Sequence, residues 1–182
     1  MLPGFIDAHG HLYNAGIQAL AANLLPAPDG SGNDIPELIR LSNEWKEKNG
    51  RIISKVGWIV GFGYDDAQLK EKRHPVATDL DKISKDTPVI LIHQSGHLAT
   101  VNTKGLALAG VTDTTSDPPG GVIRRIKGTR KPSGTLEETA MFAPLFKIFN
   151  KMPVFGLNLA VYYRCVINNF IRRNFMQLLN PS

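Results

Sequence analysis

The chain has 182 residues, of which 42% are hydrophobic and 20% charged, a composition that suits one ordinary globular domain. Its 21 basic and 16 acidic residues give a net charge of +5, which is too small and too scattered to favour a nucleic-acid binder. The single cysteine, Cys165, excludes an intrachain disulfide framework. Neither a signal peptide nor a membrane-spanning run is recognisable, so we expect a cytoplasmic protein without membrane partners.

The first predicted element is a short buried strand in the segment LPGFIDAHGHL, residues 2–12. Residues i and i+2 of a strand face the same side, so His9 and His11 could converge on one metal ion. Asp7 lies on that face and could orient an imidazole. The alternative is a strand end that carries two partly exposed histidines.

Two helices and a second strand are predicted next. Residues 17–25 are rich in alanine and leucine and favour a helix. Residues 34–50 place hydrophobic side chains at helical spacing and end in Asn49-Gly50, a common helix stop. Residues 57–65 are typical of a strand followed by a turn.

The turn after this strand contains the glycine-rich segment GFGYDD, residues 61–66. It lacks the spacing of a phosphate-binding loop. Tyr64 and Asp65 could line a substrate pocket, and a purely structural turn is the alternative. His74, in the segment EKRHP, is expected at the surface.

A further apolar strand is predicted in TPVILIHQSGH, residues 87–97, which ends with His93 and His97. Strand ends are where sites collect in α/β folds. His97 and Asn102 could therefore hydrogen-bond a substrate. The alternative is that the histidines only satisfy a turn.

The remaining elements complete an alternating pattern. Residues 103–111 predict a short helix and residues 121–126 a strand. Residues 133–150 predict a helix with Glu137 and Glu138 near its amino end, where carboxylates are favoured. Alternation of strands and helices predicts the α/β class.

The composition changes near residue 150. Residues 150–182 are aromatic and basic and contain no acidic residue. We interpret residues 1–149 as one domain and residues 150–182 as a divergent tail, which a frameshift or premature stop could have produced.

Four motifs occur in an order that resembles amidohydrolase family 3, the YtcJ-like group that includes N-substituted formamide deformylases. They are LPGFIDAHGHL, GWIVGFGYDD, LDKISKDTPVILIHQSGHLATVNTKGLALAGV and DPPGGVIRR followed by GTLEETA. The resemblance covers residues 2 to about 149.

This resemblance implies part of a TIM-like barrel of a metal-dependent hydrolase. Residues 2–12 would form the first barrel strand and residues from about 50 to 149 an inserted α/β module, so the barrel would not be closed in this chain. His9 and His11 would be metal ligands. Glu138, in the family pattern G-x-L-x-E-x-A, would be a further ligand.

The implied activity is hydrolysis of carbon–nitrogen bonds other than peptide bonds in a small amide or formamide-type substrate. A divalent metal, expected to be zinc, would activate a water molecule and polarise the carbonyl group. The expected substrate-binding residues are His97, Asn102 and Tyr64. The family's later histidine ligands and its aspartate base have no counterpart here, so we predict that the isolated chain is inactive. The alternative is a non-catalytic α/β binding or interaction module.

Overall fold

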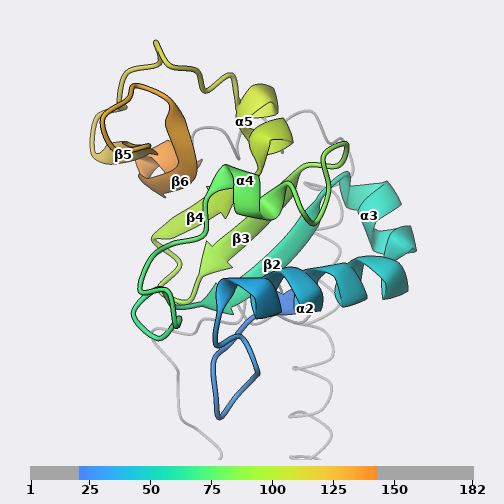
Figure 1. The fold of residues 1–182 in the computed structure, drawn as a ribbon. Coiled ribbons are helices and arrows are strands. Elements are labelled where there is room, and N and C mark those ends of the chain that lie inside the picture. Colours follow the sequence, from blue (N-terminus) through green and yellow to red (C-terminus); the bar gives the residue numbers. More distant parts are fainter. Residues whose placement is uncertain (1–20, 143–182) are drawn as a thin grey trace, which may run out of the picture. The chain divides into compact units, whose positions relative to one another are not determined.

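The computed structural model describes residues 21–142, which fold into a six-stranded sheet with helices packed against it (Figure 1). The predicted strand with His9 and His11, and the tail with Cys165, lie outside the described residues. In chain order the elements are β1 (Ala22–Asn23), α2 (Ile35–Lys48), α3 (Gly50–Val56), β2 (Ile59–Tyr64), α4 (Ala77–Leu80), β3 (Val89–His93), β4 (Leu98–Val101), α5 (Thr103–Ala109), β5 (Gly121–Arg125) and β6 (Pro132–Glu138).

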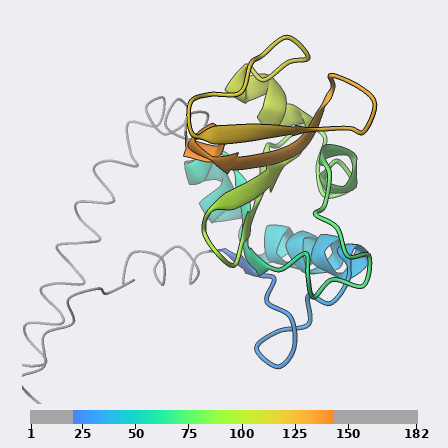
Figure 2. The same ribbon diagram turned by 90° about the vertical axis from the view of Figure 1, so that its left-hand side faces the viewer.

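The sheet is mixed, with the strand order β1-β2-β3-β4-β6-β5. The first three strands are parallel, and the other neighbouring pairs are antiparallel. Figure 2 shows the antiparallel pair β5 and β6 side by side, and the strand order puts this pair at the end of the sheet opposite β1. The open mixed sheet confirms the predicted α/β class.

Helix α2 begins where the sequence predicts a helix. Asp34 is its N-cap and accepts a hydrogen bond from the backbone N–H of Glu37 at 2.9 Å. Asn49 ends the helix through its backbone N–H, which donates to the carbonyl of Trp45 at 3.0 Å. The buried face of α2 packs on β1 and β2 through residues that include Leu38.

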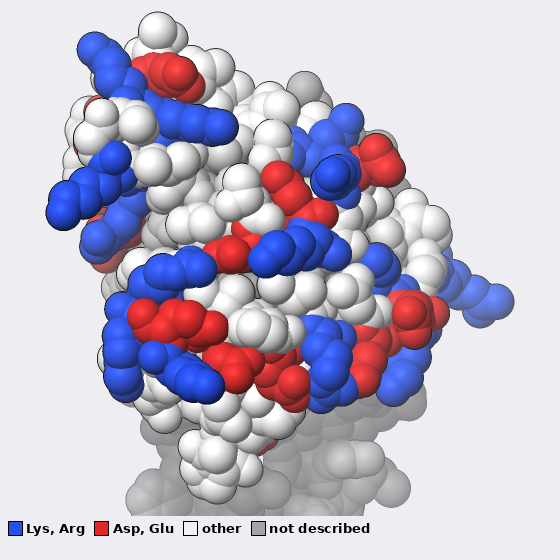
Figure 3. Space-filling model, in the orientation of Figure 1, with Lys and Arg blue, Asp and Glu red and all other residues white. Residues whose placement is uncertain are grey.

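The exposed face of α2 carries charges of both signs. Arg40 pairs with Glu37 one turn earlier and with Glu44 one turn later. Figure 3 shows acidic and basic side chains interspersed on this face of the described residues. Such exposed pairs add little stability.

The core lies between α2 and the central strands and is closely packed around Gly61. Leu24, Ile59 and Leu91 are fully buried in it. A Cβ atom on Gly61 would lie 2.5 Å from Leu24 Cδ1 and 2.8 Å from Leu91 Cδ2. A larger residue at this position would therefore displace the buried side chains of Leu24 and Leu91.

The structure also differs from the sequence-based predictions. The helix expected over residues 133–150 is wrong at its start, because residues 132–138 form β6 and helical backbone begins at residue 139. Residues 22–23, expected to be helical, form strand β1. Strand β4 and helices α3 and α4 had no counterpart in the predictions. Helix α5 and strands β2, β3 and β5 are confirmed.

Within residues 21–142, no helix is both long enough and apolar enough to cross a membrane.

Candidate functional site

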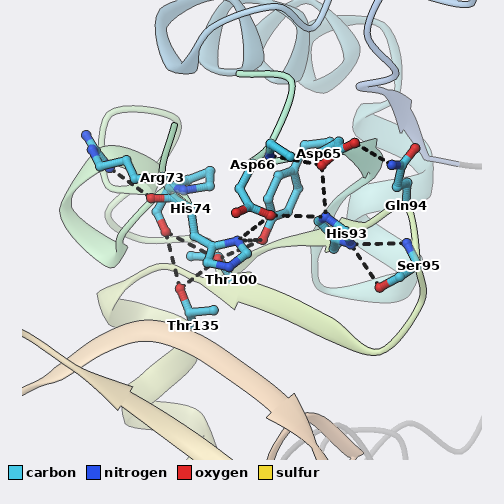
Figure 4. Close-up of polar contacts among 12 residues, drawn as sticks. Asp65, Asp66, Arg73, His74, His93, Gln94, Ser95, Thr100 and Thr135 are labelled. Carbon is cyan, nitrogen blue, oxygen red and sulfur yellow. Dashed lines mark hydrogen bonds and ion pairs between the residues drawn. The ribbon is translucent and has the colours of Figure 1, made fainter. Parts of the chain in front are cut away.

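Polar side chains gather where the parallel strands β2 and β3 end. Tyr64, the last residue of β2, pairs with His93, the last residue of β3. The register shifts between Phe62 and Tyr64 across Gly63, which has a φ of 107° that favours glycine. This bulge brings the polar segment after β2 beside the end of β3 (Figure 4).

Tyr64 forms the buried floor of this region. Its ring makes edge-on contacts with the rings of His93 and His74, at centroid distances of 5.3 and 6.1 Å. Its hydroxyl lies 3.3 Å from Thr100 Oγ1 and 3.4 Å from His74 Nδ1. Burial raises the pKa of Tyr64 above its ordinary value, so the phenol stays protonated.

Asp65 and Asp66 follow Tyr64 directly. Asp65 is buried, and its Oδ2 accepts a hydrogen bond from Gln68 Nε2 at 2.8 Å and another from Gln94 Nε2. The bond from Gln68 is the main cause that lowers the pKa of the Asp65 carboxyl. The Asp66 side chain is about one-third exposed (35%) and faces the same histidines.

His93 points its Nε2 atom at both carboxylates. This atom lies 3.3 Å from Asp66 Oδ1 and 3.6 Å from Asp65 Oδ1. It is fully buried, yet neither contact has the geometry of a hydrogen bond. The other ring nitrogen, Nδ1, lies 2.8 Å from Ser95 Oγ and accepts the backbone N–H of Ser95 at 3.1 Å.

His74 completes the group, contrary to the expectation that it lies at the surface. Its Nδ1 atom is 3.5 Å from Asp66 Oδ1, and its side chain is 15% exposed. Burial is the main cause that lowers the pKa of His74, because desolvation disfavours the imidazolium. The carbonyl of Pro75 accepts the hydroxyls of Thr100 and Thr135, which anchors the His74 loop on β4 and β6.

We call Asp65, Asp66, His74 and His93 the aspartate–histidine cluster. Within it, Asp65, Asp66 and His93 each offer a donor atom within 4.8 Å of the others. Two carboxylates and an imidazole at this spacing can share a divalent cation or a proton.

A second polar contact joins two of the predicted site residues, His97 and Glu138. His97 Nδ1 lies 3.1 Å from Glu138 Oε1, and the Glu138 N–H donates to the His97 carbonyl at 2.8 Å. Both side chains are more than half exposed, at 69% and 53%. Glu138 has a φ of 50°, an uncommon backbone conformation for a non-glycine residue that often accompanies a functional position.

Both groups lie at the same end of the sheet. The turn after His93 leads to His97, which directly precedes β4, and the Gln94 N–H donates to the Tyr64 carbonyl at 3.0 Å. Antiparallel pairing then places the end of β6, with Glu138, beside the start of β4. Of the predicted site residues, the structure thus brings Tyr64, His97 and Glu138 to one end of the sheet.

Asn102 lies elsewhere and is fully engaged within the fold. Its Oδ1 accepts the backbone N–H groups of Val89 and Gly105, at 3.0 and 2.8 Å. Its Nδ2 donates to the carbonyls of Ser84 and Thr87, at 2.7 and 3.1 Å. The side chain is fully buried. These contacts make Asn102 a structural residue that caps α5, in place of the substrate-binding role expected from the sequence.

Sequence reasoning missed the part played by Asp66 and misjudged His74. Two consecutive acids directly after an apolar strand were the available signal for Asp66. For His74 there was no local signal, because the hydroxyls that anchor its loop come from β4 and β6.

Comparisons with known proteins point to one family. The chain matches the amidohydrolase family over residues 1–170, which extends past the resemblance expected to end near residue 149. It is 35% identical over 143 residues to an N-substituted formamide deformylase of Arthrobacter pascens, covering 77% of this chain and 24% of that protein. It is 32% identical over 140 residues to the putative amidohydrolase YtcJ of Bacillus subtilis, covering 77% and 25%.

A solved structure is similar as well. An uncharacterised metal-dependent hydrolase from Pyrococcus furiosus superposes with a TM-score of 0.53 at 25% sequence identity, covering 82% of this chain and 26% of that chain. The chain therefore spans about a quarter of the length of the relatives that it matches.

Proposed function

The chain belongs to the amidohydrolase family, and we propose from this that it is part of a metal-dependent hydrolase that cleaves carbon–nitrogen bonds other than peptide bonds. The observation that carries the proposal is the family match over residues 1–170, which includes the H-x-H segment. The deformylase relative supports a small amide or formamide-type substrate.

We assign His9, His11 and Glu138 to the metal of this hydrolase site, and we take the metal to be zinc. The Glu138 carboxylate suits this role because it is more than half exposed and held by a single exposed imidazole. When bound, a zinc ion supplies an activated water and polarises the substrate carbonyl. His97 would orient the Glu138 carboxylate or meet the substrate, whereas Tyr64, also expected from the sequence to bind substrate, is fully buried at the ends of β2 and β3.

The 182-residue chain alone should not turn over such substrates. A catalytic zinc ion usually has three protein ligands in fixed positions, and a further residue must act as base. We propose that further barrel strands, beyond the quarter of the family length present here, supply the remaining groups. Metal-dependent hydrolysis of an N-substituted formamide by the purified chain would refute this.

A chimera tests the hydrolase assignment itself. Residues 2–149 would replace the matching segment of the Arthrobacter deformylase, and formate release would be measured with zinc present. We expect activity in the chimera and a loss of at least about 100-fold when His9 and His11 are both changed to alanine. A folded chimera that releases no formate, or one indifferent to the two histidines, would contradict the proposal.

The second candidate function is a non-catalytic α/β binding module. The observation that favours it is the hydrophobic core formed within residues 21–142, which includes the fully buried Leu38, Ile59 and Leu91. A sharp thermal transition with a midpoint that added Zn²⁺ does not change would support this candidate. In both cases we propose a cytoplasmic location, because the single Cys165 offers no intrachain disulfide.

A further inference from the structure

We propose that Asp65, Asp66 and His93 together bind one divalent cation of the Zn²⁺ or Mn²⁺ type, at the ends of β2 and β3. This inference goes beyond the proposed hydrolase function, because it involves none of the residues assigned there to the hydrolase metal. We call the three residues the DDH site.

The spacing of the donor atoms fits a shared cation. Ligands about 2.0–2.2 Å from a zinc ion lie roughly 3–3.6 Å from one another. His93 Nε2 lies 3.3 Å from Asp66 Oδ1 and 3.6 Å from Asp65 Oδ1. All three donor atoms lie within 4.8 Å of one another, so the side chains would have to draw together to share one ion.

The local charge also calls for a cation. Among the described residues, histidines are the only basic side chains in ion-pair contact with Asp65 and Asp66, and neutral amide groups hydrogen-bond Asp65. Two adjacent carboxylates repel each other when no cation compensates them. A divalent ion would balance both charges.

The third observation is the buried Nε2 atom of His93, which lacks a hydrogen-bond partner while it faces both carboxylates. A buried polar atom left unsatisfied costs free energy, and metal coordination would satisfy it.

Neighbouring groups already orient the ligands. Gln68, Gln94 and the Ala67 N–H hold the Asp65 carboxylate. Ser95 holds the far side of the His93 ring, as groups beside metal-bound imidazoles commonly do.

The contacts of Ser95 also predict which ring nitrogen of His93 carries the proton with and without a bound metal. Without metal, Nδ1 accepts the Ser95 N–H, so the ring proton resides on Nε2. With metal on Nε2, that proton must reside on Nδ1, where Ser95 Oγ at 2.8 Å can accept it. Cation binding should therefore switch the tautomer of His93.

The donor set selects the class of ion. One imidazole and two carboxylates suit Zn²⁺ or Mn²⁺, whereas Ca²⁺ takes six to eight oxygen ligands and Mg²⁺ avoids nitrogen in favour of oxygen. Three protein donors leave positions for water.

The test is Zn²⁺ titration of the full chain by calorimetry in a background that carries His9→Ala and His11→Ala. One Zn²⁺ site should remain in this background. Asp66→Asn and His93→Gln should each weaken it by at least about 100-fold, whereas loss of a merely orienting group costs about 10- to 100-fold. The matched control is Asp86→Asn, which changes an exposed residue outside the DDH site and should leave the affinity unchanged.

Equal Zn²⁺ affinity in the Asp66→Asn variant and its background would overturn the proposal, and so would Mg²⁺ binding as tight as Zn²⁺ binding. Asp66 is partly exposed, so its variant should fold even if His93→Gln does not.

Nitrogen-15 NMR of the histidine rings gives a second readout, in which Zn²⁺ should move the His93 proton from Nε2 to Nδ1. An unchanged tautomer at saturation would reject coordination by Nε2. Because the chimera experiment reports only formate release, the two proposals can fail independently.

Discussion

At the residue scale, single buried polar side chains connect parts of the chain that are far apart in sequence. Asn102 links the start of β3, the loop before it and the first turn of α5 through four hydrogen bonds. Each such hydrogen bond adds little net stability, because the same groups bond to water in the unfolded chain. A buried polar group left without its partner lowers the stability of the fold much more. Asn102 should therefore matter more for stability than its size suggests.

We predict that Asn102→Ala lowers the free energy of unfolding by about 3 kcal/mol, since it removes a helix cap and leaves several buried backbone groups unpaired. Urea unfolding followed by fluorescence would measure this. Asn102→Asp should destabilise at least as much, because it places a buried carboxylate oxygen against the carbonyls of Ser84 and Thr87. Asn43→Ala, which removes only a contact to Lys46, is the control. A loss no larger than that of the control would contradict the structural role.

We predict that Tyr64→Phe removes part of the loss of stability at alkaline pH. The folded-state pKa of Tyr64 is raised by burial, whereas an unfolded tyrosine ionises near pH 10. Above about pH 10 the unfolded state therefore binds fewer protons than the folded state, and stability falls as the pH rises. Unfolding curves between pH 8 and 11 should decline less steeply in Tyr64→Phe than in the unchanged protein. If both proteins lost stability equally as the pH rises, Tyr64 would not be the cause of this pH dependence.

At the scale of elements, β6 shows how close packing can override a helical sequence pattern. Gly134 in this strand has a φ of 108°, and a Cβ atom there would lie 2.6 Å from the Val101 carbonyl oxygen and 2.8 Å from the Ala77 nitrogen. The strand thus passes directly over α4 and the end of β4 at a residue without a side chain. This contact helps to bring Glu138 beside His97.

We predict that Gly134→Ala destabilises the protein by at least about 2 kcal/mol more than Gly128→Ala. Both glycines have positive φ, at 108° and 77°, but nothing lies within 4 Å of a Cβ atom on Gly128. The difference between the two variants in thermal or urea unfolding therefore reports the close contact together with the greater backbone strain at a φ of 108°. Equal losses would mean that β6 can move away from α4 without cost.

At the scale of the whole molecule, residues 21–142 form one hydrophobic core, and polar side chains gather beside it at one end of the sheet. Trp58 is buried, and Trp45 packs against the core as a partly buried residue. They are the only two tryptophans in the sequence, so tryptophan emission reports on this unit.

We predict that residues 21–142 of the full chain unfold in a single cooperative transition in buffer with EDTA, with coincident curves from tryptophan emission and far-UV circular dichroism. The reason is that the core cluster spans α2 and the central strands without needing a bound ion. Added Zn²⁺ should raise the midpoint if the DDH site binds it. Broad or non-coincident curves would instead indicate a product that does not fold as one unit.

Much of the fold was predictable where a regular hydrophobic pattern continued over many residues, or where a residue that commonly ends a helix marked the boundary. Helix α2 has both, with Asp34 at one end and Asn49 at the other. Strands β2 and β3 are continuous apolar runs. Strand β6 was not predictable in this way, because its identity depends on pairing with β4 and β5 and on the space above Gly134.

The sequence by itself determined the α/β class, the main helix, the central strands and the family, because these depend on local hydrophobic period, capping residues and the order of motifs. Only the tertiary structure decided which polar residues meet. The bulge at Gly63 and the parallel register of β2 and β3 bring Asp65 and Asp66 to His93, and the pairing of β4 with β6 brings Glu138 to His97. Those contacts join residues distant in sequence, and their geometry follows from strand register, which the packing of the whole sheet sets.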